Sequence, residues 1–274
     1  MRLEGKTAWI IIILITSSLI LNALTLTLTL GIIPIPNGES DSEKAPIAIR
    51  IDDIQDYAFK ESQLILLSHH LTFKIPATIG IIAGHIGEDR DIVGLINEGL
   101  GEVWEIASHG WDANPLAGID LEGQIELLRM SKNRLEEIFG TRVNTFIPPM
   151  YLFDENTLKA AERAGYSTVS SHARLSEPGP LINDLVSVPA TVEFSRYLVD
   201  EGRWERKTLE ELYIEVLRSV REYGYAVVVT HPQEFVEDGE FDWSRFQVYA
   251  KFLELLDERF RLTFIRELRG VAVS

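Results

Sequence analysis

From about residue 46 onward, short apolar stretches alternate repeatedly with longer amphipathic ones. The short stretches are rich in β-branched residues, as buried strands are, whereas the longer ones repeat their apolar positions with helical spacing. Strands are predicted at residues 47–51, 77–83, 103–107, 144–147, 167–170, 225–230 and 262–265. Helices are predicted at residues 61–71, 91–100, 121–139, 154–164, 208–223 and 242–258. This alternation predicts a parallel sheet with helices outside it.

The number of strand–helix units favours one arrangement of this sheet. About seven strands in roughly 225 residues suit an α/β fold in which the sheet closes, or nearly closes, into a (β/α) barrel. A doubly wound open sheet is the alternative. No Gly-x-Gly-x-x-Gly or phosphate-loop motif follows the first predicted strand, which disfavours a nucleotide-binding site. Residues 46–274 are therefore predicted to form one barrel domain.

The first 45 residues differ from the rest because a long stretch of them carries no charge. No charged residue occurs from Thr7 to Gly38, and residues 9–33 are rich in Ile and Leu. About 20 apolar residues span a bilayer as a helix, so residues 7–33 are predicted to be a transmembrane helix. A cleaved signal peptide is the alternative, although signal peptides have a shorter apolar region and a cleavage site between small residues.

The charges that flank this apolar segment predict its orientation. Basic residues precede it at Arg2 and Lys6, and acidic residues follow it between positions 39 and 43. Since positive charge is retained in the cytoplasm, residues 1–6 are predicted to be a cytoplasmic stub, with the barrel on the extracellular side. Prolines, an asparagine and a glycine end the helix, and residues 34–45 are predicted to be a linker.

Overall charge and cysteine content disfavour several classes of function. The net charge is −16, and an acidic surface repels the phosphates of nucleic acid, which is not expected as a partner. The chain has no cysteine, which excludes disulfides, thiolate nucleophiles and cysteine metal sites. Any metal would therefore be held by His, Asp, Glu, Asn or water.

Polar residues gather at the carboxyl ends of the predicted strands, where parallel β/α folds place catalytic side chains. These residues are Asp52, Asp53, His85, Ser108, His109, Pro148, Pro149, Tyr151, Ser171, His172 and His231. Four of the six histidines belong to this set, which predicts one polar site at one end of the barrel. His69 and His70 lie on a predicted helix instead and are expected to be surface residues.

Two adjacent carboxylates directly after an apolar strand are costly unless they have a function. Successive side chains of a strand point in different directions, so one of Asp52 and Asp53 can bind a metal while the other stays free as a base. A helix N-cap beside a solvated neighbour is the alternative for this pair. His231 alone would be interpreted as a structural residue, but it shares the predicted site with the aspartates and His109.

Four short motifs, in the same order along the chain, resemble those of the polysaccharide deacetylases (NodB-homology domain, carbohydrate esterase family 4). Residues 50–54 (RIDDI) resemble the family's T-F-D-D-G motif, and residues 108–111 (SHGW) resemble the start of H-x-x-x-H. Residues 145–149 (TFIPP) resemble its R-x-P-P-like turn, and residues 229–232 (VTHP) resemble its L-x-L-H motif. Each motif is weak alone, whereas the ordered set, over roughly residues 46–235, is specific.

The resemblance implies a distorted (β/α) barrel that removes N- or O-acetyl groups from a polysaccharide with the help of zinc or another divalent metal. It implies that Asp53 and His109 bind the metal. Asp52 would be the general base toward metal-bound water, and His231 the general acid that protonates the leaving group.

The same resemblance implies where the substrate is held. The turn that begins at Pro149 would bring a backbone amide near Met150 or Tyr151 to the oxyanion of the reaction. The ring of Trp111, beside the second motif, is a candidate for stacking on a sugar, and so are Tyr151, Trp204 and Trp243.

Two positions depart from the family pattern. Ala113 stands where the second histidine of H-x-x-x-H belongs, and Ile147 stands where many members have an arginine that orients the base. Another group would therefore have to orient Asp52. A catalytic zinc site has three protein ligands plus water, so His85 is predicted to replace the missing histidine, with Asp112 or Asn114 beside the gap as alternatives.

The sequence thus predicts a membrane-anchored, divalent-metal-dependent polysaccharide deacetylase that acts on an extracellular glycan. The alanine at position 113 leaves one alternative open, a catalytically impaired protein of the same fold that binds cell-envelope carbohydrate without turnover. A hydrolase on the same barrel that cleaves a non-sugar amide is a third possibility.

Overall fold

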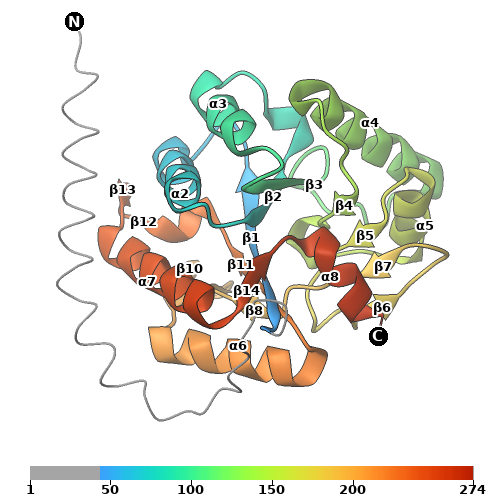
Figure 1. The fold of residues 1–274 in the computed structure, drawn as a ribbon. Helices are drawn as coiled ribbons and strands as arrows, with labels where there is room; N and C mark the ends of the chain where they lie inside the picture. Colours follow the sequence, from blue (N-terminus) through green and yellow to red (C-terminus); the bar gives the residue numbers. More distant parts are fainter. Residues whose placement is uncertain (1–43, 274) are drawn as a thin grey trace, which may run out of the picture. The chain divides into compact units, whose positions relative to one another are not determined.

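The computed structural model describes residues 44–273, which form an α/β fold (Figure 1). The predicted membrane helix at residues 7–33, the stub before it and nearly all of the linker lie outside the described residues. Between residues 44 and 273, no helix is both long enough and apolar enough to cross a bilayer.

The main sheet has ten strands, and its order places the first strand of the chain beside a strand from near the end. The order is β6-β7-β5-β4-β3-β2-β1-β11-β8, with β14 also pairing with β1. All pairs in this sheet are parallel except β6 with β7. The strands are β1 (Pro46–Ile54), β2 (Ala77–Ile81), β3 (Trp104–Ser108), β4 (Thr145–Phe146), β5 (Thr168–Val169), β6 (Gly179–Pro180), β7 (Val186–Ser187), β8 (Val192–Glu193), β11 (Ala226–Thr230) and β14 (Arg261–Thr263).

This strand order identifies the sheet as a curled, incompletely closed barrel. From β1 to β5 the strands follow one another in chain order, and β11 lies on the other side of β1. A doubly wound sheet would instead reverse its order at an internal strand, so that alternative is wrong. The path through the sheet ends at β6 and β8, which leaves the barrel open between them.

Helices surround the sheet on its outer side, as the strand–helix alternation predicts (Figure 1). They are α2 (Lys60–Phe73), α3 (Arg90–Gly99), α4 (Leu121–Phe139), α5 (Glu155–Arg163), α6 (Leu209–Tyr223) and α7 (Trp243–Arg259). Their ends carry the expected signals. In α6 the Thr208 side chain accepts from Glu211 N at 3.2 Å while the Glu211 carboxylate accepts from Thr208 N at 2.7 Å, a reciprocal cap. Gly140, with φ of 62°, ends α4 in the left-handed conformation that glycine adopts easily.

A last helix, α8 (Ile265–Ala272), packs on the amino-terminal end of the barrel and was not predicted. Its buried residues Ile265 and Leu268 join an apolar cluster with β1, β7 and β11. The amide of Arg266 donates to the buried carboxylate of Glu105 at 3.1 Å, and Glu105 also accepts from two threonine hydroxyls. The buried Glu105 carboxylate is therefore satisfied by groups of the protein itself.

The segment between β5 and α6 contains strands that were not predicted from the sequence. β6, β7 and β8 have two residues each, which is too short for a periodic pattern to show. A hairpin follows, formed by β9 (Ser195–Leu198) and β10 (Arg203–Arg206). A second small hairpin, β12 (Val236–Glu237) with β13 (Glu240–Phe241), follows β11. Both hairpins lie outside the main sheet.

The prediction that His69 and His70 are surface residues is wrong. His70 is fully buried, and His69 is only 8% exposed. The Nδ1 of His70 lies 2.8 Å from the carbonyl of Ile75, and its Nε2 lies 2.8 Å from the Tyr249 hydroxyl. Because a carbonyl only accepts, Nδ1 carries the proton and Nε2 accepts from Tyr249. The two histidines fill the contact between α2 and α7, where their rings pack against aromatic side chains.

These buried histidines predict that the fold is sensitive to mild acid. Burial lowers the pKa of His70 to about 4 and, together with the nearby His70, lowers that of His69 to about 3. The unfolded chain takes up these protons near pH 6.5, so stability is complete above that pH and falls as the pH decreases below it. For His70 alone the loss from pH 7 to pH 5 is about 2 kcal/mol. Urea denaturation at both pH values measures it, and His70→Gln should flatten the dependence. An equally steep loss in that variant would contradict the assignment.

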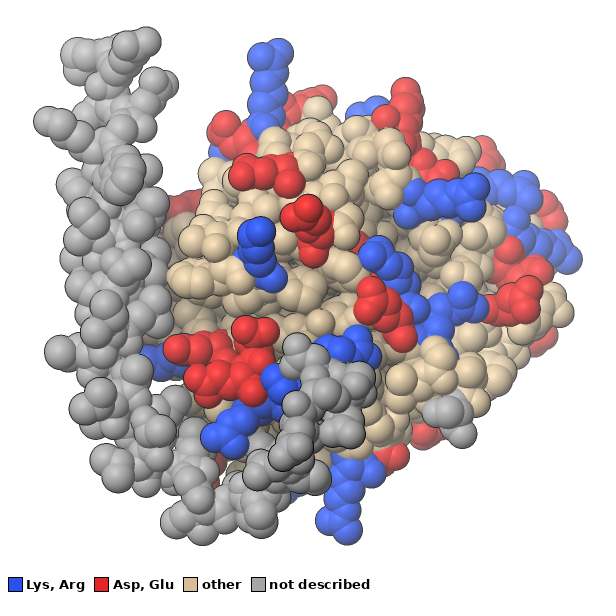
Figure 2. Space-filling view, viewed as in Figure 1, with Lys and Arg blue, Asp and Glu red and all other residues tan. Residues whose placement is uncertain are grey.

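On the face shown in Figure 2, acidic and basic side chains are interspersed over the surface. Several form local ion pairs, such as Lys60 with Asp89 at 2.7 Å and Lys60 with Asp91 at 2.8 Å. Exposed pairs of this kind contribute little to stability. The fold therefore depends mainly on its apolar core and on the buried polar groups at the two ends of the barrel.

Candidate functional site

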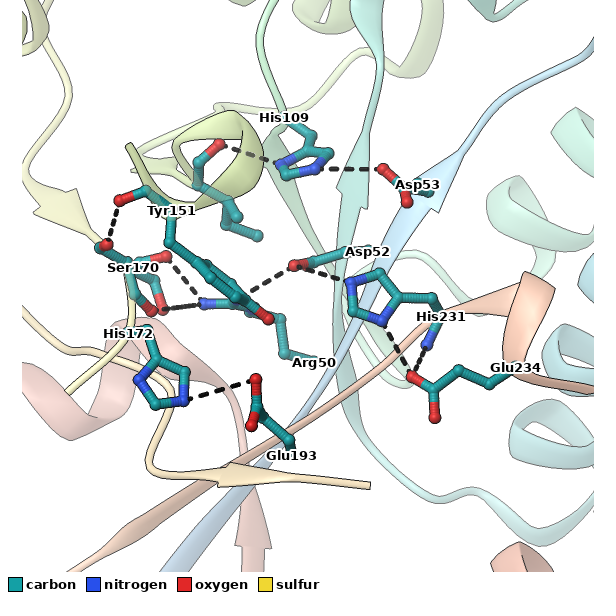
Figure 3. A network of polar contacts seen from close by, with 12 residues as sticks. Arg50, Asp52, Asp53, His109, Tyr151, Ser170, His172, Glu193, His231 and Glu234 are labelled. Atoms are coloured by element: carbon teal, nitrogen blue, oxygen red, sulfur yellow. Dashed lines mark hydrogen bonds and ion pairs between the residues drawn. The ribbon is translucent and has the colours of Figure 1, made fainter. Parts of the chain in front are cut away.

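Four side chains that can transfer protons or bind a metal meet at the carboxyl ends of the barrel strands (Figure 3). Asp52 and Asp53 belong to β1, His109 follows β3, and His231 follows β11. Asp53 Oδ1 lies 3.2 Å from His109 Nε2, and Asp52 Oδ2 lies 4.0 Å from His231 Nε2. The structure therefore places these four residues in one polar site.

An irregularity in β1 explains how two adjacent aspartates serve the same site. In a regular strand, successive side chains point to opposite faces. The pairing of β1 with β2 shifts its register between Ile51 and Ile54, and Asp53 has φ of 60°, in the left-handed region. Such irregularities re-aim side chains, and strained non-glycine residues of this kind cluster at functional sites.

Arg50 holds Asp52 in place from two positions earlier in the same strand. Its Nη2 donates to Asp52 Oδ2 at 2.9 Å, and both side chains are fully buried. Its Nη1 donates to the Ser170 carbonyl at 2.7 Å, the Ser170 hydroxyl at 2.9 Å and the Ser171 carbonyl at 3.1 Å. Arg50 thus gives Asp52 a cationic partner that Ile147, in the third motif, does not supply.

The second carboxylate oxygen of Asp52 is buried, and no hydrogen-bond partner for it is found within residues 44–273. It lies against Gly80 of β2, where an added Cβ would come within 2.9 Å of it. Glycine at this position therefore makes room for the carboxylate. A buried carboxylate oxygen with unused lone pairs is suited to accept a proton from a reacting group.

His109 and Asp53 form a polarised pair. The Nδ1 of His109 donates to the Ile147 carbonyl at 3.0 Å, which directs Nε2 toward Asp53. Burial lowers the pKa of His109, but the hydrogen bond to Asp53 and the charges of both aspartates outweigh it and raise that pKa. Burial likewise raises the pKa of Asp53, and the bond and charge of His109 outweigh it, so the pKa of Asp53 lies well below its usual range.

Gln233 contacts the other oxygen of Asp53. It lies on the short helix η3 (Pro232–Phe235), directly after β11, and its Nε2 donates to Asp53 Oδ2 at 2.6 Å. Its Oε1 is buried and has no hydrogen-bond partner within the described part of the chain. The carboxylate of Asp53 is therefore flanked by a histidine on one oxygen and by a glutamine on the other.

The structure does not bring His85 to this pair, contrary to the prediction that it completes a metal site. His85 ends the short helix η1 (Ala83–His85), is exposed, and packs edge-on against the ring of Tyr57 at 5.1 Å. Within residues 44–273, no three His, Cys, Asp or Glu side chains are placed to hold a metal together. Ala113 and Asn114, in the loop after His109, are also exposed.

His231 has a carboxylate partner on the side away from Asp52. Its Nδ1 and its backbone amide each lie 2.9 Å from Glu234 Oε1. Burial lowers the pKa of His231, but the bond and charge of Glu234, with the charges of Asp52 and Asp53, raise it to about 9. His231 is therefore protonated at neutral pH and can donate a proton from Nε2.

The turn expected to hold an oxyanion has an unusual backbone. In the short helix η2 (Pro149–Tyr151), Met150 and Tyr151 have φ of 54° and 61°. The Tyr151 amide already donates to the Pro148 carbonyl at 3.0 Å, so it is used inside the turn. This leaves the amide of Met150 as the better candidate for an oxyanion. The Tyr151 ring lies over the Arg50 guanidinium, 5.4 Å from its carbon, and covers the partner of Asp52.

The aromatic residues proposed to bind sugar differ in their surroundings. Trp111 is half-buried and packs against Gly84, with a hydrogen bond from Gly84 N to the Trp111 carbonyl at 2.7 Å. Trp243 packs edge-on against Phe241, outside the group shown in Figure 3. Trp204, on β10, lies 5.2 Å from the His231 ring and 5.1 Å from that of Tyr197. Beside it is a cavity of about 650 Å³, lined by the two small hairpins and by Glu234.

Four residues of the site were not singled out from the sequence: Arg50, Ser170, Gln233 and Glu234. Arg50 and the pair Gln233–Glu234 lie within three residues of a predicted catalytic residue. Proximity to a motif is therefore the signal that could have found them. Ser170 carries no such signal, because it acts through its carbonyl and hydroxyl.

Known proteins resemble this chain in sequence over part of its length and in fold. A family model described as polysaccharide deacetylase matches residues 39–169, which include Asp52, Asp53, His109 and the turn at Pro149. No curated protein matches the chain in sequence. A solved structure from Mycobacterium smegmatis, assigned by name to the polysaccharide deacetylases, superposes with a TM-score of 0.63 at 18% identity. That match covers 88% of this chain and 94% of the other.

Two further solved structures share the fold and differ in what their titles report. A family 4 acetyl xylan esterase from Clostridium thermocellum, in complex with a cobalt ion, has a TM-score of 0.56 at 14% identity, covering 84% of this chain and 93% of the other. A CE4 family pseudoenzyme from Bacillus anthracis has a TM-score of 0.54 at 15% identity, covering 83% of this chain and 66% of the other. Residues 39–169 therefore match the model of the polysaccharide deacetylase family, and the chain shares the fold of these solved structures.

Proposed function

We propose that this protein is a divalent-metal-dependent hydrolase that removes acetyl groups from an extracellular glycan. The observation that carries the proposal is the single site shared by Asp52, Asp53, His109 and His231. It combines a carboxylate with an unpartnered oxygen, a protonated histidine, and a histidine–carboxylate pair. These groups are the base, the acid and the start of a metal site that hydrolysis of an acetyl group requires.

Asp53 and His109 would hold the metal. The bond from His109 Nδ1 to the Ile147 carbonyl fixes the ring so that Nε2 can present a lone pair beside the Asp53 carboxylate. One imidazole nitrogen and carboxylate oxygens suit zinc and several other divalent ions. Such an ion, when bound, lowers the pKa of water and polarises a carbonyl. Because it replaces the proton on His109 Nε2, the affinity for the metal should increase with pH.

The remaining groups of the site transfer protons. Asp52, which accepts a hydrogen bond from Arg50 on one oxygen, takes a proton from the attacking water through its other oxygen. The water oxygen forms a bond to the acetyl carbon, and the bond from that carbon to the sugar nitrogen or oxygen breaks. His231 gives its proton to that nitrogen or oxygen, so that acetate and a free amine or hydroxyl are released.

The glycan would lie beside Trp204. This indole packs on the His231 ring at 5.2 Å, and the adjacent cavity of about 650 Å³ is large enough for sugar rings. A sugar stacked on Trp204 would present its acetyl group next to the proton donor. Trp204→Ala should therefore raise KM for acetylated oligomers more than it lowers kcat, in assays of acetate release.

We also propose that residues 7–33 anchor the protein in a membrane with the barrel outside. The uncharged apolar run and the basic residues before it support this proposal. Protease treatment of intact cells should cleave the barrel while leaving the amino terminus protected. Recovery of the full-length barrel in the medium, without residues 7–33, would support the signal-peptide alternative.

The reaction is tested with the full-length protein and acetylated chito-oligomers. Acetate release is expected to stop after treatment with a chelator and to return when zinc, cobalt or manganese is added. In Asp53→Ala, added metal should no longer restore acetate release, because the proposed carboxylate ligand of the metal is missing. No acetate with any of these ions would reject the proposal.

Introducing the family's missing histidine should strengthen the metal site. Ala113→His is expected to tighten zinc binding about tenfold or more, because imidazole is a strong ligand for zinc. Isothermal titration calorimetry measures the affinity. Ala117→His, at another exposed alanine of the same loop, is the matched control and should change nothing. Unchanged affinity in Ala113→His would show that position 113 does not face the metal.

A second candidate function is carbohydrate binding without turnover. The exposed Ala113 favours it, and so does the likeness of fold to a CE4 pseudoenzyme. Under this alternative, glycan binding should be insensitive to a chelator and unchanged in Asp53→Ala. Turnover that a chelator stops would exclude it.

A further inference from the structure

We infer that Gln233 supplies the third protein ligand of the metal site, in place of the histidine that Ala113 replaces. The inference rests on the proposed function, because it completes the ligand set of the same metal. Gln233 comes from η3, far from Ala113 in the sequence, and it contacts the oxygen of Asp53 that His109 does not.

The distances from His109 and from Gln233 to Asp53 are near those of atoms that share a metal. His109 Nε2 lies 3.2 Å from one oxygen of Asp53, and Gln233 Nε2 lies 2.6 Å from the other. Ligand atoms bound at about 2.0–2.1 Å to one ion lie about 2.9–3.4 Å apart in tetrahedral or octahedral geometry. The Asp53 carboxylate is thus close to this spacing from His109 on one oxygen and from Gln233 on the other.

The oxygen of the Gln233 amide points to the same conclusion. Oε1 is buried and has no partner within the described residues. Buried acceptors in folded proteins are nearly always satisfied by a protein group, a water or an ion. The terminal torsion of glutamine is broad, and a half-turn exchanges Oε1 with Nε2. The oxygen would then face Asp53, an arrangement of two acceptors that is favourable only with a cation between them.

The two orientations of the amide suit the two states of the site. Without metal, Nε2 donates to Asp53 and stabilises the ionised carboxylate, as in this structure. With metal, Oε1 becomes a ligand. An amide oxygen is a harder ligand than an imidazole nitrogen, so an Asp–His–Gln set should favour manganese relative to zinc more than an Asp–His–His set does.

The test is isothermal titration calorimetry of zinc and manganese with the full-length protein. Gln233→Ala is expected to weaken the binding of both ions about tenfold or more. Gln233→His should strengthen zinc binding more than manganese binding. Gln233→Glu keeps the size of the side chain and an oxygen ligand, so it should retain binding. Gln247→Ala, at an exposed glutamine of α7, is the matched control and should bind as the unmodified protein does.

A second measurement reports coordination directly. The visible absorption of bound cobalt depends on its ligands, and it should change in Gln233→Ala but not in Gln247→Ala. Unaltered affinity and an unaltered spectrum in Gln233→Ala would overturn the inference, and so would a lack of metal binding by the unmodified protein.

Acetate release, measured in parallel, decides the proposed function separately. If acetate is released and Gln233→Ala binds metal normally, the inference fails and the function stands. If Gln233→Ala weakens metal binding but the unmodified protein releases no acetate, the inference stands and the proposed function fails.

Discussion

Replacing His231 with glutamine is expected to lower the rate of acetate release by about 10²- to 10⁴-fold, because it removes the proposed proton donor. The Nε2 of His231 lies 4.0 Å from Asp52, and His231 is not among the proposed metal ligands, so the metal affinity should not fall. The rate constant kcat and the affinity for zinc, measured on the same preparation, separate the two effects. Full activity in His231→Gln would mean that another group protonates the leaving atom.

The partner of His231 gives the pH dependence of the same step. Its pKa of about 9 depends on the bond and charge of Glu234, which outweigh the effect of burial. The acid form is present below this pH, so activity should be retained at neutral pH and fall as the pH rises through about 9. Glu234→Gln should move this fall to lower pH, which a profile of kcat/KM against pH detects. A pH profile of Glu234→Gln that is not shifted would show that His231 is not the general acid.

Replacing Arg50 with methionine is expected to destabilise the fold by about 3–5 kcal/mol, because it leaves the buried Asp52 without its cationic partner. Both side chains are fully buried, and Arg50 also donates to Ser170 and Ser171, so the variant loses these hydrogen bonds together with the ion pair. Urea denaturation measures the free energy of unfolding. Arg221→Met, at an exposed arginine of α6, is the control and should have little effect.

A double-mutant cycle distinguishes this buried pair from a general packing effect. Asp52→Asn combined with Arg50→Met should recover part of the loss, since the unpaired carboxylate is then removed. Arg50→Lys keeps the charge but not the planar fork that reaches Asp52 and Ser170 together, so it should recover only part of the stability. Additive losses in the cycle would show that the two side chains do not stabilise each other.

Much of the fold could be predicted because most of its elements are long and periodic. Helix α4 begins and ends where the sequence predicts, at Leu121 and Phe139, since an aspartate precedes it and a glycine follows. The strands β6, β7 and β8 could not be predicted, because two residues carry no alternation. The burial of His69 and His70 was missed for a different reason. It depends on α7, more than 170 residues later, which supplies Tyr249.

The site shows the same division between local and distant information. The motifs mark Asp52, Asp53, His109 and His231, and the strand order brings these residues together. The partners of these residues were harder to predict, because an arginine or a glutamine can donate hydrogen bonds to any buried acceptor, and the sequence does not show which one. Arg50 can donate to Asp52 from this buried position because its other terminal nitrogen donates to the carbonyls of Ser170 and Ser171, about 120 residues later. The loop position of His85 after β2 suggested a ligand, but the direction of its ring depends on the turn of η1.

The position of β1 has a consequence for the way the protein is made. Arg50, Asp52 and Asp53 emerge from the ribosome early, but the strand that pairs with them on one side, β11, is synthesised about 180 residues later. Until then one edge of an apolar strand is unpaired, which invites association with other chains. Contacts so distant in sequence also slow folding. Nascent chains that stop short of residue 226 should therefore depend on chaperones and bind no metal at Asp53.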